Sequence, residues 1–277
     1  MSGPEHLKTV DRALDVVEYL SQVGEPTRLT DISRAVRLPK SQVHRILVTL
    51  TNRKFIQQDA STLRYFLGIN TWIVGQRASL ASPVLLVARP ILDQIYLKES
   101  IYLAILEDYQ TYYLYIRFGS HPIQALVPVG GNGPLHATAT GKSLLAFQPP
   151  EFIQSFLSKP LRKFTPKTIT NPDKLQLEIE KIRKNFYSRV DEEFETDFSG
   201  IAVPILDAQN QSLAAVGISS PSSRFTSDHE DMMVQTALDA ARAVQLGLGL
   251  PCPRSAQFQI SSQFSPINQT KEMDYAG

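Results

Sequence analysis

Residues 29–56 constrain the fold more than any other stretch, because their apolar residues follow a helical period on both sides of a tight turn. The first helix has an apolar stripe, and Thr30 is its expected N-cap. Leu38 should end that helix, since the residue before a proline is disfavoured in the α conformation. From Val43, apolar residues recur at i, i+3, i+4 and i+7, which gives the second helix one core-facing side. The stretch therefore predicts a helix-turn-helix.

The opposite side of the second helix is polar and basic. It carries Lys40, Ser41, Gln42, His44, Arg45 and Thr49. Arginine and lysine pair with phosphates or guanine, and glutamine pairs with adenine, so such a face fits the major groove of DNA. We expect Lys40, Ser41, Gln42 and Arg45 to read bases and His44 to contact the DNA backbone or to pack. The alternative is an ordinary amphipathic hairpin with a solvated face.

Charge is distributed unevenly along the chain. The formal net charge is only +1, so the total does not indicate a nucleic-acid partner. Between residues 30 and 64, however, seven lysines and arginines accompany two aspartates. A local basic patch in a neutral protein is typical of a small DNA-binding module attached to a larger domain. Arg53 and Lys54 in this patch are expected to contact phosphates.

The flanks of this stretch complete a DNA-binding module. Residues 9–23 predict a helix capped by Thr9. Residues 55–58 and 63–67 read as two strands joined by a turn at 59–62, which predicts a hairpin. Helices followed by a hairpin make a winged helix-turn-helix, and Arg64 on the wing is a candidate phosphate or minor-groove contact. The alternative for Arg64 is a solvated strand residue.

Residues 71–97 read as mostly helical, with Pro83 and Pro90 as interruptions. Their large apolar residues, Trp72 among them, are too numerous for a free linker. They need either the downstream domain or a second copy of the same helix as a partner. A protein that binds palindromic DNA needs two DNA-binding domains at a fixed spacing, so we favour dimerisation here.

From residue 100 the apolar period changes to two, which is typical of strands. Strands are expected at 101–106, 112–118, 123–129, 187–190, 201–206 and 213–219. Helices are expected at 138–147, 149–157 and 171–185, and from Ser227 onward. This order predicts an α+β domain with an antiparallel sheet. The expected domains are 1–68 for DNA binding, 69–98 for linkage and dimerisation, 99–250 for a regulatory domain, and 251–277 for a disordered tail.

Composition excludes several classes of protein. The lone cysteine, Cys252, rules out an intramolecular disulfide and provides no metal-site spacing. The N-terminus is polar and does not resemble a signal peptide. No uncharged apolar run reaches about 18 residues, so no membrane partner is expected. We expect a cytoplasmic protein without cofactor or metal.

Several motifs together resemble the IclR-type family of bacterial transcription regulators over about residues 8–249. In chain order they are TVDRALDVVEYL, LTDISRAVRLPKSQVHRIL, YFLG, ARPIL, PLHATATGKSLLAF, DEEFE, IAVPI, VGISSP and RFTSD. The resemblance implies a winged helix-turn-helix, a linker helix and a GAF-like effector domain. It also implies homodimers or dimers of dimers on double-stranded operator DNA, controlled by a small, usually carboxylate-bearing metabolite.

The resemblance also implies where such an effector would bind. Free backbone N–H groups at the start of a helix bind carboxylates, and residues 137–141 open a predicted helix. The effector-binding candidates carried over from the family are Gly133, Leu135, Ala139, Thr140, Asp191, Gly200, Gly217 and Ser219.

The chain departs from the family pattern at several of these positions. Val190 replaces an often acidic residue, Gly200 replaces a frequent cysteine, Gly217 lies in a strand that is usually richer in serine, and Asp197 replaces a usual glycine. Fewer polar groups and less side-chain volume predict a larger or less polar pocket, and hence a bulkier or different effector.

Three alternative functions remain open at this stage. HATATGKS resembles a P-loop whose Lys142 would bind phosphates in an NTPase, but His136 replaces the first glycine. The carboxylate cluster at 191–195 and the scattered histidines suggest no catalytic residues of another enzyme. A winged-helix regulator whose second domain only assembles dimers would share the DNA contacts and lack the effector. We expect a regulator rather than an enzyme.

Overall fold

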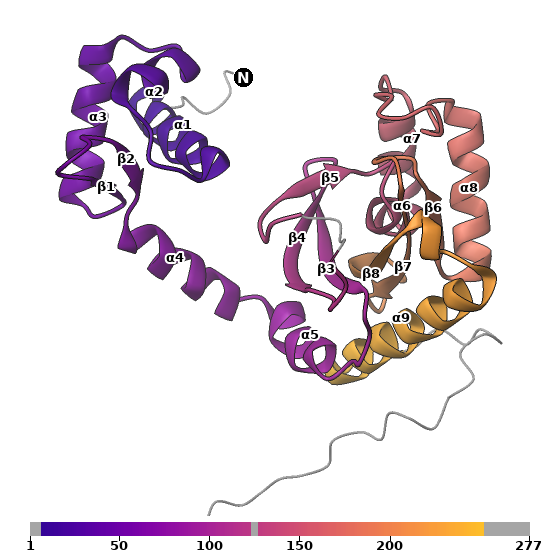
Figure 1. Cartoon of the computed structure of the whole chain (residues 1–277). Coiled ribbons are helices and arrows are strands. Elements are labelled where there is room, and N and C mark those ends of the chain that lie inside the picture. The colour runs from indigo at the N-terminus through magenta and orange to yellow at the C-terminus, as the bar shows by residue number, and fades with distance from the viewer. Residues whose placement is uncertain (1–6, 123–126, 252–277) are drawn as a thin grey trace, which may run out of the picture. The chain divides into compact units, whose positions relative to one another are not determined.

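The computed structural model describes residues 7–122 and 127–251, and it divides into two compact units, Met1–Ser82 and Pro83–Gly277 (Figure 1). The tail expected at 251–277 lies outside the described residues except for Pro251. The strand expected at 123–129 lies partly outside them, and its described residues 127–129 form no strand. No helix in the described ranges is long and apolar enough to span a membrane.

The first unit is a winged helix-turn-helix, as the sequence predicted. Its elements are α1 (Lys8–Val23), α2 (Leu29–Ala35), α3 (Lys40–Asn52), β1 (Ile56–Gln58), β2 (Tyr65–Leu67) and α4 (Ile69–Leu80). Strands β1 and β2 pair antiparallel. A small core fixes α3 against α1 and α2 through Val16, Leu20, Ile32, Val43 and Leu47, each at most 2% exposed.

The expected N-caps of the first two helices were wrong. Both N-caps lie two residues earlier than expected, at Leu7 and Arg28, and neither makes a side-chain capping bond. Thr9 and Thr30 therefore lie inside the helices. Helix α1 ends as its glycine suggests: Gly24 adopts φ 69° and donates its N–H to the carbonyl of Leu20.

The second unit is an α+β domain built on one antiparallel sheet, again as predicted. Its elements are α5 (Pro83–Asp93), β3 (Ser100–Glu107), β4 (Gln110–Arg117), β5 (Asn132–Pro134), α6 (Ala139–Ala146), α7 (Pro150–Leu157), α8 (Pro172–Asn185), β6 (Ser188–Asp191), β7 (Phe198–Leu206), β8 (Ser212–Pro221), η1 (Ser222–Arg224) and α9 (Ser227–Gly247). The strand order among the described residues is β5-β4-β3-β8-β7-β6.

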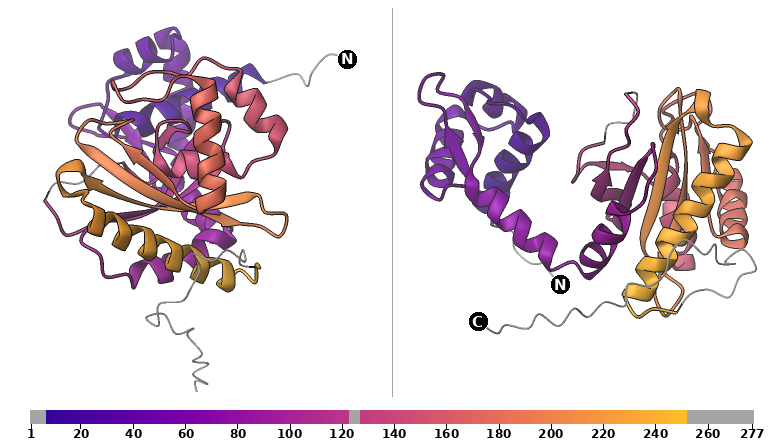
Figure 2. Two further views of the ribbon diagram at one scale, coloured as in Figure 1. Left: turned by 90° about the vertical axis from the view of Figure 1, so that its right-hand side faces the viewer. Right: turned by 60° about the horizontal axis from the view of Figure 1, so that its bottom comes forward.

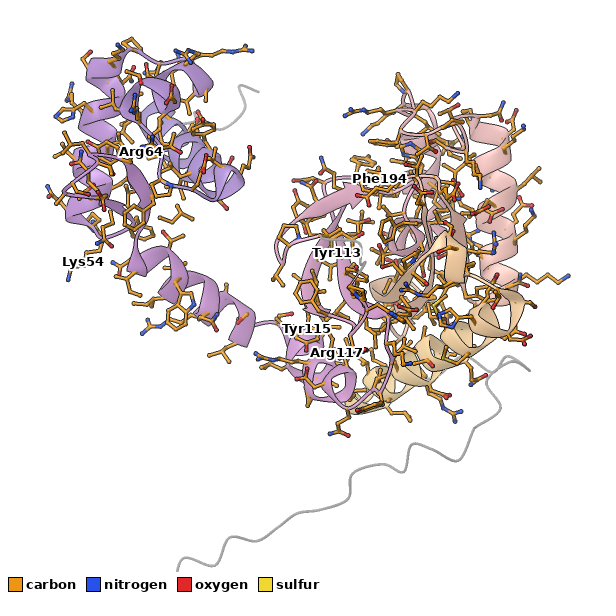
Figure 3. The ribbon with its side chains drawn as sticks, in the orientation of Figure 1. Lys54, Arg64, Tyr113, Tyr115, Arg117 and Phe194 are labelled. Carbon is orange, nitrogen blue, oxygen red and sulfur yellow. The ribbon has the colours of Figure 1, made fainter. Side chains whose placement is uncertain are left out.

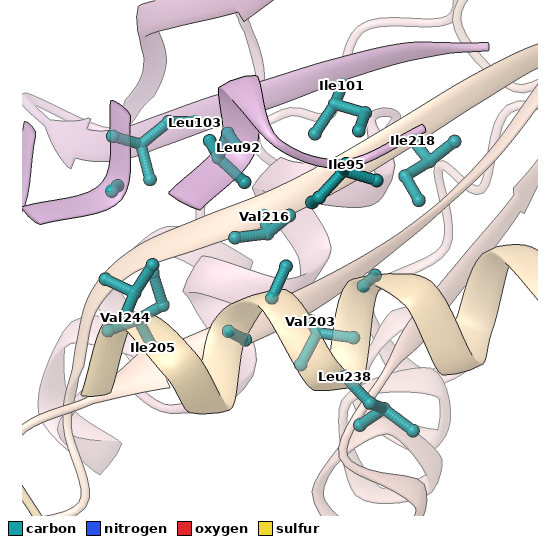
Figure 4. Close-up of a cluster of buried hydrophobic side chains, with 14 of the residues drawn as sticks. Leu92, Ile95, Ile101, Leu103, Val203, Ile205, Val216, Ile218, Leu238 and Val244 are labelled. Atoms are coloured by element: carbon teal, nitrogen blue, oxygen red, sulfur yellow. The ribbon is translucent and has the colours of Figure 1, made fainter. Parts of the chain in front are cut away.

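The sheet separates α5 and α9 from α6, α7 and α8 (Figure 2). Alternate residues of β3, β7 and β8 pack on α5 and α9, for example Leu103, Val203 and Val216 against Leu92 and Val244 (Figure 4). The residues between them face the other way, where Tyr102, Ala104 and Ala215 pack with Leu144 of α6. This period of two gives the sheet a second apolar face, on which α6 packs.

Three details differ from the sequence-based expectations. Strand β5 was missed, because Asn-Gly-Pro contains no β-forming residue; it is held by pairing with β4. The N-cap of α9 is Thr226 rather than Ser227. The linker region contains two helices, α4 in the first unit and α5 in the second, and Pro90 lies inside α5 instead of ending it.

Candidate functional sites

Helix α3 presents one apolar side and one polar side. Val43 and Leu47 are fully buried, and Ile46 is 7% exposed, so this side is committed to the core. Lys40, Ser41, His44, Arg45 and Thr49 are exposed. We call these five residues together with Gln42 the α3 face. No ion pair within 4.0 Å involves Lys40 or Arg45 among the described residues, so both charges remain available to a ligand.

Two residues of α3 differ from what the sequence suggested. Gln42 is half-buried because it lies at the border between the polar side and the core side, so it reaches less far than Arg45. Val48 was missed because only polar residues were considered; it is 44% exposed and follows Arg45 by one turn. An exposed apolar side chain among basic ones suits the methyl group of thymine.

The end of α3 and the base of the wing are joined closely. A Cβ on Gly68 would lie 2.4 Å from the carbonyl oxygen of Lys54, so only glycine fits there. Asn70 reinforces the joint by donating its Nδ2 to the carbonyl of Arg53 at 2.7 Å. Arg53 and Lys54 are exposed. The joint therefore fixes the backbone from which these two positively charged side chains extend, next to the wing.

Arg64 is anchored more firmly than a free phosphate-binding arginine. It is half-buried on the wing, and its Nη1 donates to the carbonyl of Pro26 at 3.2 Å (Figure 3). The guanidinium keeps further N–H donors for a phosphate, because an arginine carries five.

The turn of the wing is organised by Asp59. Its Oδ1 accepts hydrogen bonds from the N–H and hydroxyl groups of both Ser61 and Thr62, at 2.6–3.1 Å. These bonds lower the pKa of Asp59 to about 2, with the Ser61 hydroxyl contributing most. Asp-Ala is a weaker sequence signal for a hairpin turn than Asp-Gly, but here the side chain of Asp59 itself closes the turn.

In the second unit, a cavity of about 90 Å³ lies at the start of α6; we call it the α6 cavity. Five of the eight candidates line it: Ala139, Thr140, Gly200, Gly217 and Ser219. Thr138 caps α6 by accepting the N–H of Gly141 at 3.1 Å. The structure thus brings together residues from α6, β7 and β8 that are far apart in the sequence.

The other three candidates do not line the α6 cavity. Leu135 is fully buried and packs with α7 and α8. Gly133 lies on β5, where a Cβ would be 3.2 Å from the Thr138 methyl group. Asp191 accepts a hydrogen bond from Ser199 at 3.0 Å and pairs with Lys167 at 3.1 Å. Each of these three residues contacts other parts of the protein instead of the α6 cavity. The family pattern alone did not reveal these contacts.

Two tyrosines that sequence reasoning missed line the α6 cavity. Tyr102 and Tyr113 meet edge to face with ring centroids 5.5 Å apart. Ser219 donates to the Tyr102 oxygen at 3.1 Å, and the Tyr113 and Thr140 hydroxyls lie 3.3 Å apart. Burial raises the pKa of both tyrosines, so both remain neutral. The period of two assigns each tyrosine to one face of its strand, but the pairing of β3 with β4 and β8 decides that the two rings meet beside α6.

Charge around the α6 cavity is sparse. Among the described lining residues the only carboxylate is Glu195, which is exposed and lies beside Phe194. No lysine or arginine lines the cavity in the described part of the chain. An acidic group of a ligand would therefore depend on the N–H groups at the start of α6 and on the hydroxyls.

Gly200 and Gly217 do not enlarge the pocket as the sequence analysis expected. A Cβ on Gly217 would lie 2.6 Å from the Thr140 methyl group, and one on Gly200 would lie 2.9 Å from the carbonyl oxygen of Ile218. Both glycines allow close packing, while Phe194 and Phe198 occupy part of the wall. The α6 cavity is therefore small and largely apolar rather than large.

Lys142 cannot serve as a P-loop lysine in this arrangement. It is fully buried, and its Nζ lies 2.5 Å from Oε1 of Glu193. Burial raises the pKa of Glu193 although Lys142 acts in the opposite direction. Glu193 also accepts a hydrogen bond at its carbonyl from Thr168 at 2.6 Å. The pair joins α6 to the loop that carries Phe194 and Glu195, which makes it a structural link in the wall of the α6 cavity.

The histidines and carboxylates of the described ranges lie apart from one another or are engaged in contacts within the protein. No group of three or more histidine, cysteine, aspartate or glutamate residues there could hold a metal ion. His136, which replaces the first P-loop glycine, is hydrogen-bonded through Nε2 to the carbonyl of Arg162 at 2.8 Å. Burial lowers its pKa, so the neutral form is favoured.

Comparison with known proteins agrees with this architecture. The chain is 27% identical over 248 residues to the transcriptional repressor IclR of Escherichia coli (strain K12), covering 88% of this chain and 90% of that protein. It is 29% identical over 246 residues to the HTH-type transcriptional repressor AllR of the same organism, covering 88% and 91%. Both relatives are transcriptional repressors.

Solved structures show the same fold. An IclR homolog from Microbacterium hydrocarbonoxydans, complexed with 4-hydroxybenzoate, superposes with a TM-score of 0.79 at 26% identity, covering 87% of this chain and 99% of that one. The IclR transcriptional regulator of Alicyclobacillus acidocaldarius gives a TM-score of 0.80 at 23% identity, covering 88% and 99%.

Matches to family descriptions cover both units. Residues 9–60 match the IclR helix-turn-helix domain, and residues 78–246 match the family described as bacterial transcriptional regulator IclR C-terminal. With a basic helix on a winged module and a second domain of matching sequence and fold, the chain belongs to the IclR family of bacterial transcriptional regulators.

Proposed function

We propose that this protein is a transcriptional repressor that binds double-stranded operator DNA and is controlled by a small molecule in the α6 cavity. The observation that carries the proposal is the α3 face, with exposed Lys40 and Arg45 that have no acidic partner in the described part of the chain. The names of the relatives IclR and AllR support repression rather than activation.

Base reading is assigned to Lys40, Ser41, Gln42 and Arg45, with Thr49 and Val48 beside them. Arg45 is the main reader because it is exposed and charged, while Gln42 is half-buried at the edge. The part of the affinity that does not depend on the DNA sequence is assigned to phosphate contacts. Arg53, Lys54 and Arg64 make these contacts, together with His44 near the groove.

Assembly into homodimers is assigned to α4. No residue of α4 is buried, although several of its side chains are large and apolar: Trp72 is 63% exposed and Leu80 is 65% exposed. Large exposed apolar side chains on one short helix mark an interaction site. A Trp72→Glu variant should lose the dimer in sedimentation and weaken operator binding, whereas a Gln76→Glu variant, on the same helix, should keep both. An unchanged dimer in Trp72→Glu would move the interface elsewhere.

Control by a ligand is assigned to the α6 cavity because its lining combines hydroxyls, tyrosines and the start of a helix. A volume of about 90 Å³ suits a small molecule. The complex of the Microbacterium homolog with 4-hydroxybenzoate supports a ligand in this class of domain. Such a ligand changes DNA binding only to the extent that it binds the DNA-bound and free arrangements with different affinity.

The proposal is tested by measuring how the protein binds fluorescently labelled DNA taken from upstream of the operons that neighbour its own gene. We expect tight, salt-dependent binding by the wild-type chain and a shift in affinity with one member of a panel of small acids and phenols. The shift should disappear in Tyr113→Phe/Ser219→Ala while binding of DNA without ligand remains. Binding without any ligand response would favour a second domain that only assembles dimers, and absence of DNA binding would refute the function.

A further inference from the structure

A second cavity of about 980 Å³ lies in the C-terminal unit, apart from the α6 cavity. We call it the Glu99 cavity. It is formed where the chain enters β3, where β4 ends, and where η1 leads into α9. Its lining shares no described residue with the lining of the α6 cavity. It therefore needs an explanation of its own.

The lining of the Glu99 cavity is predominantly cationic. Lys98, Arg117 and Arg224 carry permanent positive charges, and His121 and His229 can become protonated. Glu99 is the only carboxylate among the described lining residues. With neutral histidines the described lining thus carries more positive than negative charge.

Glu99 is already satisfied by the protein. Its side chain is 2% exposed. One carboxylate oxygen lies 3.0 Å from Nη2 of Arg224 and the other lies 3.0 Å from Nε2 of His229. Ser220 adds a hydroxyl at 3.3 Å. Burial would raise the pKa of Glu99, but Arg224 and the histidines outweigh burial and lower it. The cavity thus stabilises the negative charge it already contains.

Two cations remain without an acidic partner. Neither Lys98 nor Arg117 has a carboxylate within 4.0 Å among the described residues. Arg117 (Figure 3) donates Nη2 to the carbonyls of Leu97 and Glu99 at 2.8 and 3.1 Å, while its Nε is buried without a hydrogen-bond partner. Burial lowers the pKa of Arg117, and Tyr115 and Asp93 offset this lowering only in part. Asp93 is itself hydrogen-bonded to Tyr115.

The rim of the cavity adds apolar surface. Tyr96 is fully exposed, Phe118 is 52% exposed and Met232 is 40% exposed, and all three line the cavity. Lysine and arginine beside exposed aromatic rings suit a molecule with an anionic group and an apolar body.

We infer that the Glu99 cavity is a second ligand site, which binds an organic acid with its carboxylate or phosphate against Lys98 and Arg117 and its apolar body against Tyr96 and Phe118. Residues 94–99 form both the connection between α5 and β3 and part of the cavity wall. A ligand there contacts the segment that leads from the linker region into the sheet. The inference does not depend on what the α6 cavity binds.

Calorimetric titration of the full chain tests this site with benzoate, phenyl phosphate and the neutral benzyl alcohol. We expect one acid to bind and benzyl alcohol to bind at least about tenfold more weakly. Benzoate and phenyl phosphate separate a carboxylate ligand from a phosphate ligand. Lys98→Glu should weaken the acid at least about tenfold, and Lys98→Met should weaken it less. Lys98 is exposed, so both variants should fold.

Ser219→Ala in the α6 cavity is the matched control: it affects only ligands of that cavity, so the acid binding that Lys98→Glu weakens should stay at full strength in it. Loss of binding in Ser219→Ala with full binding in Lys98→Glu would place the acid in the α6 cavity and overturn the inference. Equal binding of benzyl alcohol, or no binding of either acid up to about 10 mM, would also overturn it.

Discussion

The α3 face and the α6 cavity use opposite physical means to hold a ligand. The α3 face is one exposed helix side with permanent cations. The α6 cavity is assembled from six elements or their ends and contains hydroxyls and tyrosines but no lysine or arginine among its described lining residues. Long-range charge therefore dominates the first site, and short-range shape and hydrogen bonding dominate the second. Salt and surface mutations should affect the first, and buried mutations the second.

The largest effect that separates the two regions should come from Lys142→Met. It leaves Glu193 buried without its partner, which costs about 3–5 kcal/mol of the free energy of unfolding. Urea unfolding of the full chain measures it. Lys181→Met is the matched control, because Lys181 is exposed and pairs with Glu178 on the surface; it should cost about 0–1 kcal/mol. Equal losses in the two variants would show that the Lys142–Glu193 pair is no structural link.

Arg45→Ala should act on binding and leave stability unchanged. We expect a loss of roughly 1–3 kcal/mol in operator affinity, measured by fluorescence anisotropy, with an unchanged unfolding curve. Gln42→Ala should relax the base preference at one position at a cost within the same range, and less than Arg45→Ala because Gln42 is half-buried. If neither variant altered the binding-site profile, the assignment of the α3 face would be wrong.

Arg64→Ala should weaken binding to all DNA sequences alike. Removal of one phosphate contact should reduce the slope of log affinity against log salt concentration by about one. Titrations of operator and unrelated DNA at several salt concentrations measure this slope. A loss confined to the operator would instead indicate that Arg64 reads the minor groove, which would sharpen the division between reading and anchoring residues.

The smallest effect should be local and acid-dependent. The folded-state pKa of Asp59 is about 2, below its ordinary value of 3.8. Because the folded state lowers this pKa, the stabilisation of the wing turn is present above pH 3.8 and is lost as the pH falls through about 2. The protection of the Ser61 and Thr62 amides against hydrogen exchange, taken relative to their intrinsic rates, should fall over this window. Asp59→Ala should show fast exchange there at every pH, and an unchanged rate would contradict the turn's dependence on this carboxylate.

The two regions also differed in how far the sequence could predict them. The α3 face was predicted because a helical period places neighbours along the chain on one side, so Lys40 and Arg45 follow from spacing alone. The family pattern suggested Ala139, Thr140 and Ser219, and the structure places all three in the lining of the α6 cavity. It did not suggest Tyr102 and Tyr113, because their position depends on the pairing of β3, β4 and β8. Gly217 was misread as lost volume, since only the structure shows the Thr140 methyl group against it.

Genome-wide mapping of binding sites for the wild-type chain and for Arg45→Ala tests the central claim most directly. If the protein binds operator DNA as a dimer through its two α3 faces, the wild type enriches a few fragments that contain two related half-sites about one helical turn apart. Arg45→Ala, with its unfolding curve unchanged, should lose that enrichment. An identical set of fragments for both proteins, or no enriched fragment for the wild type, would contradict the account.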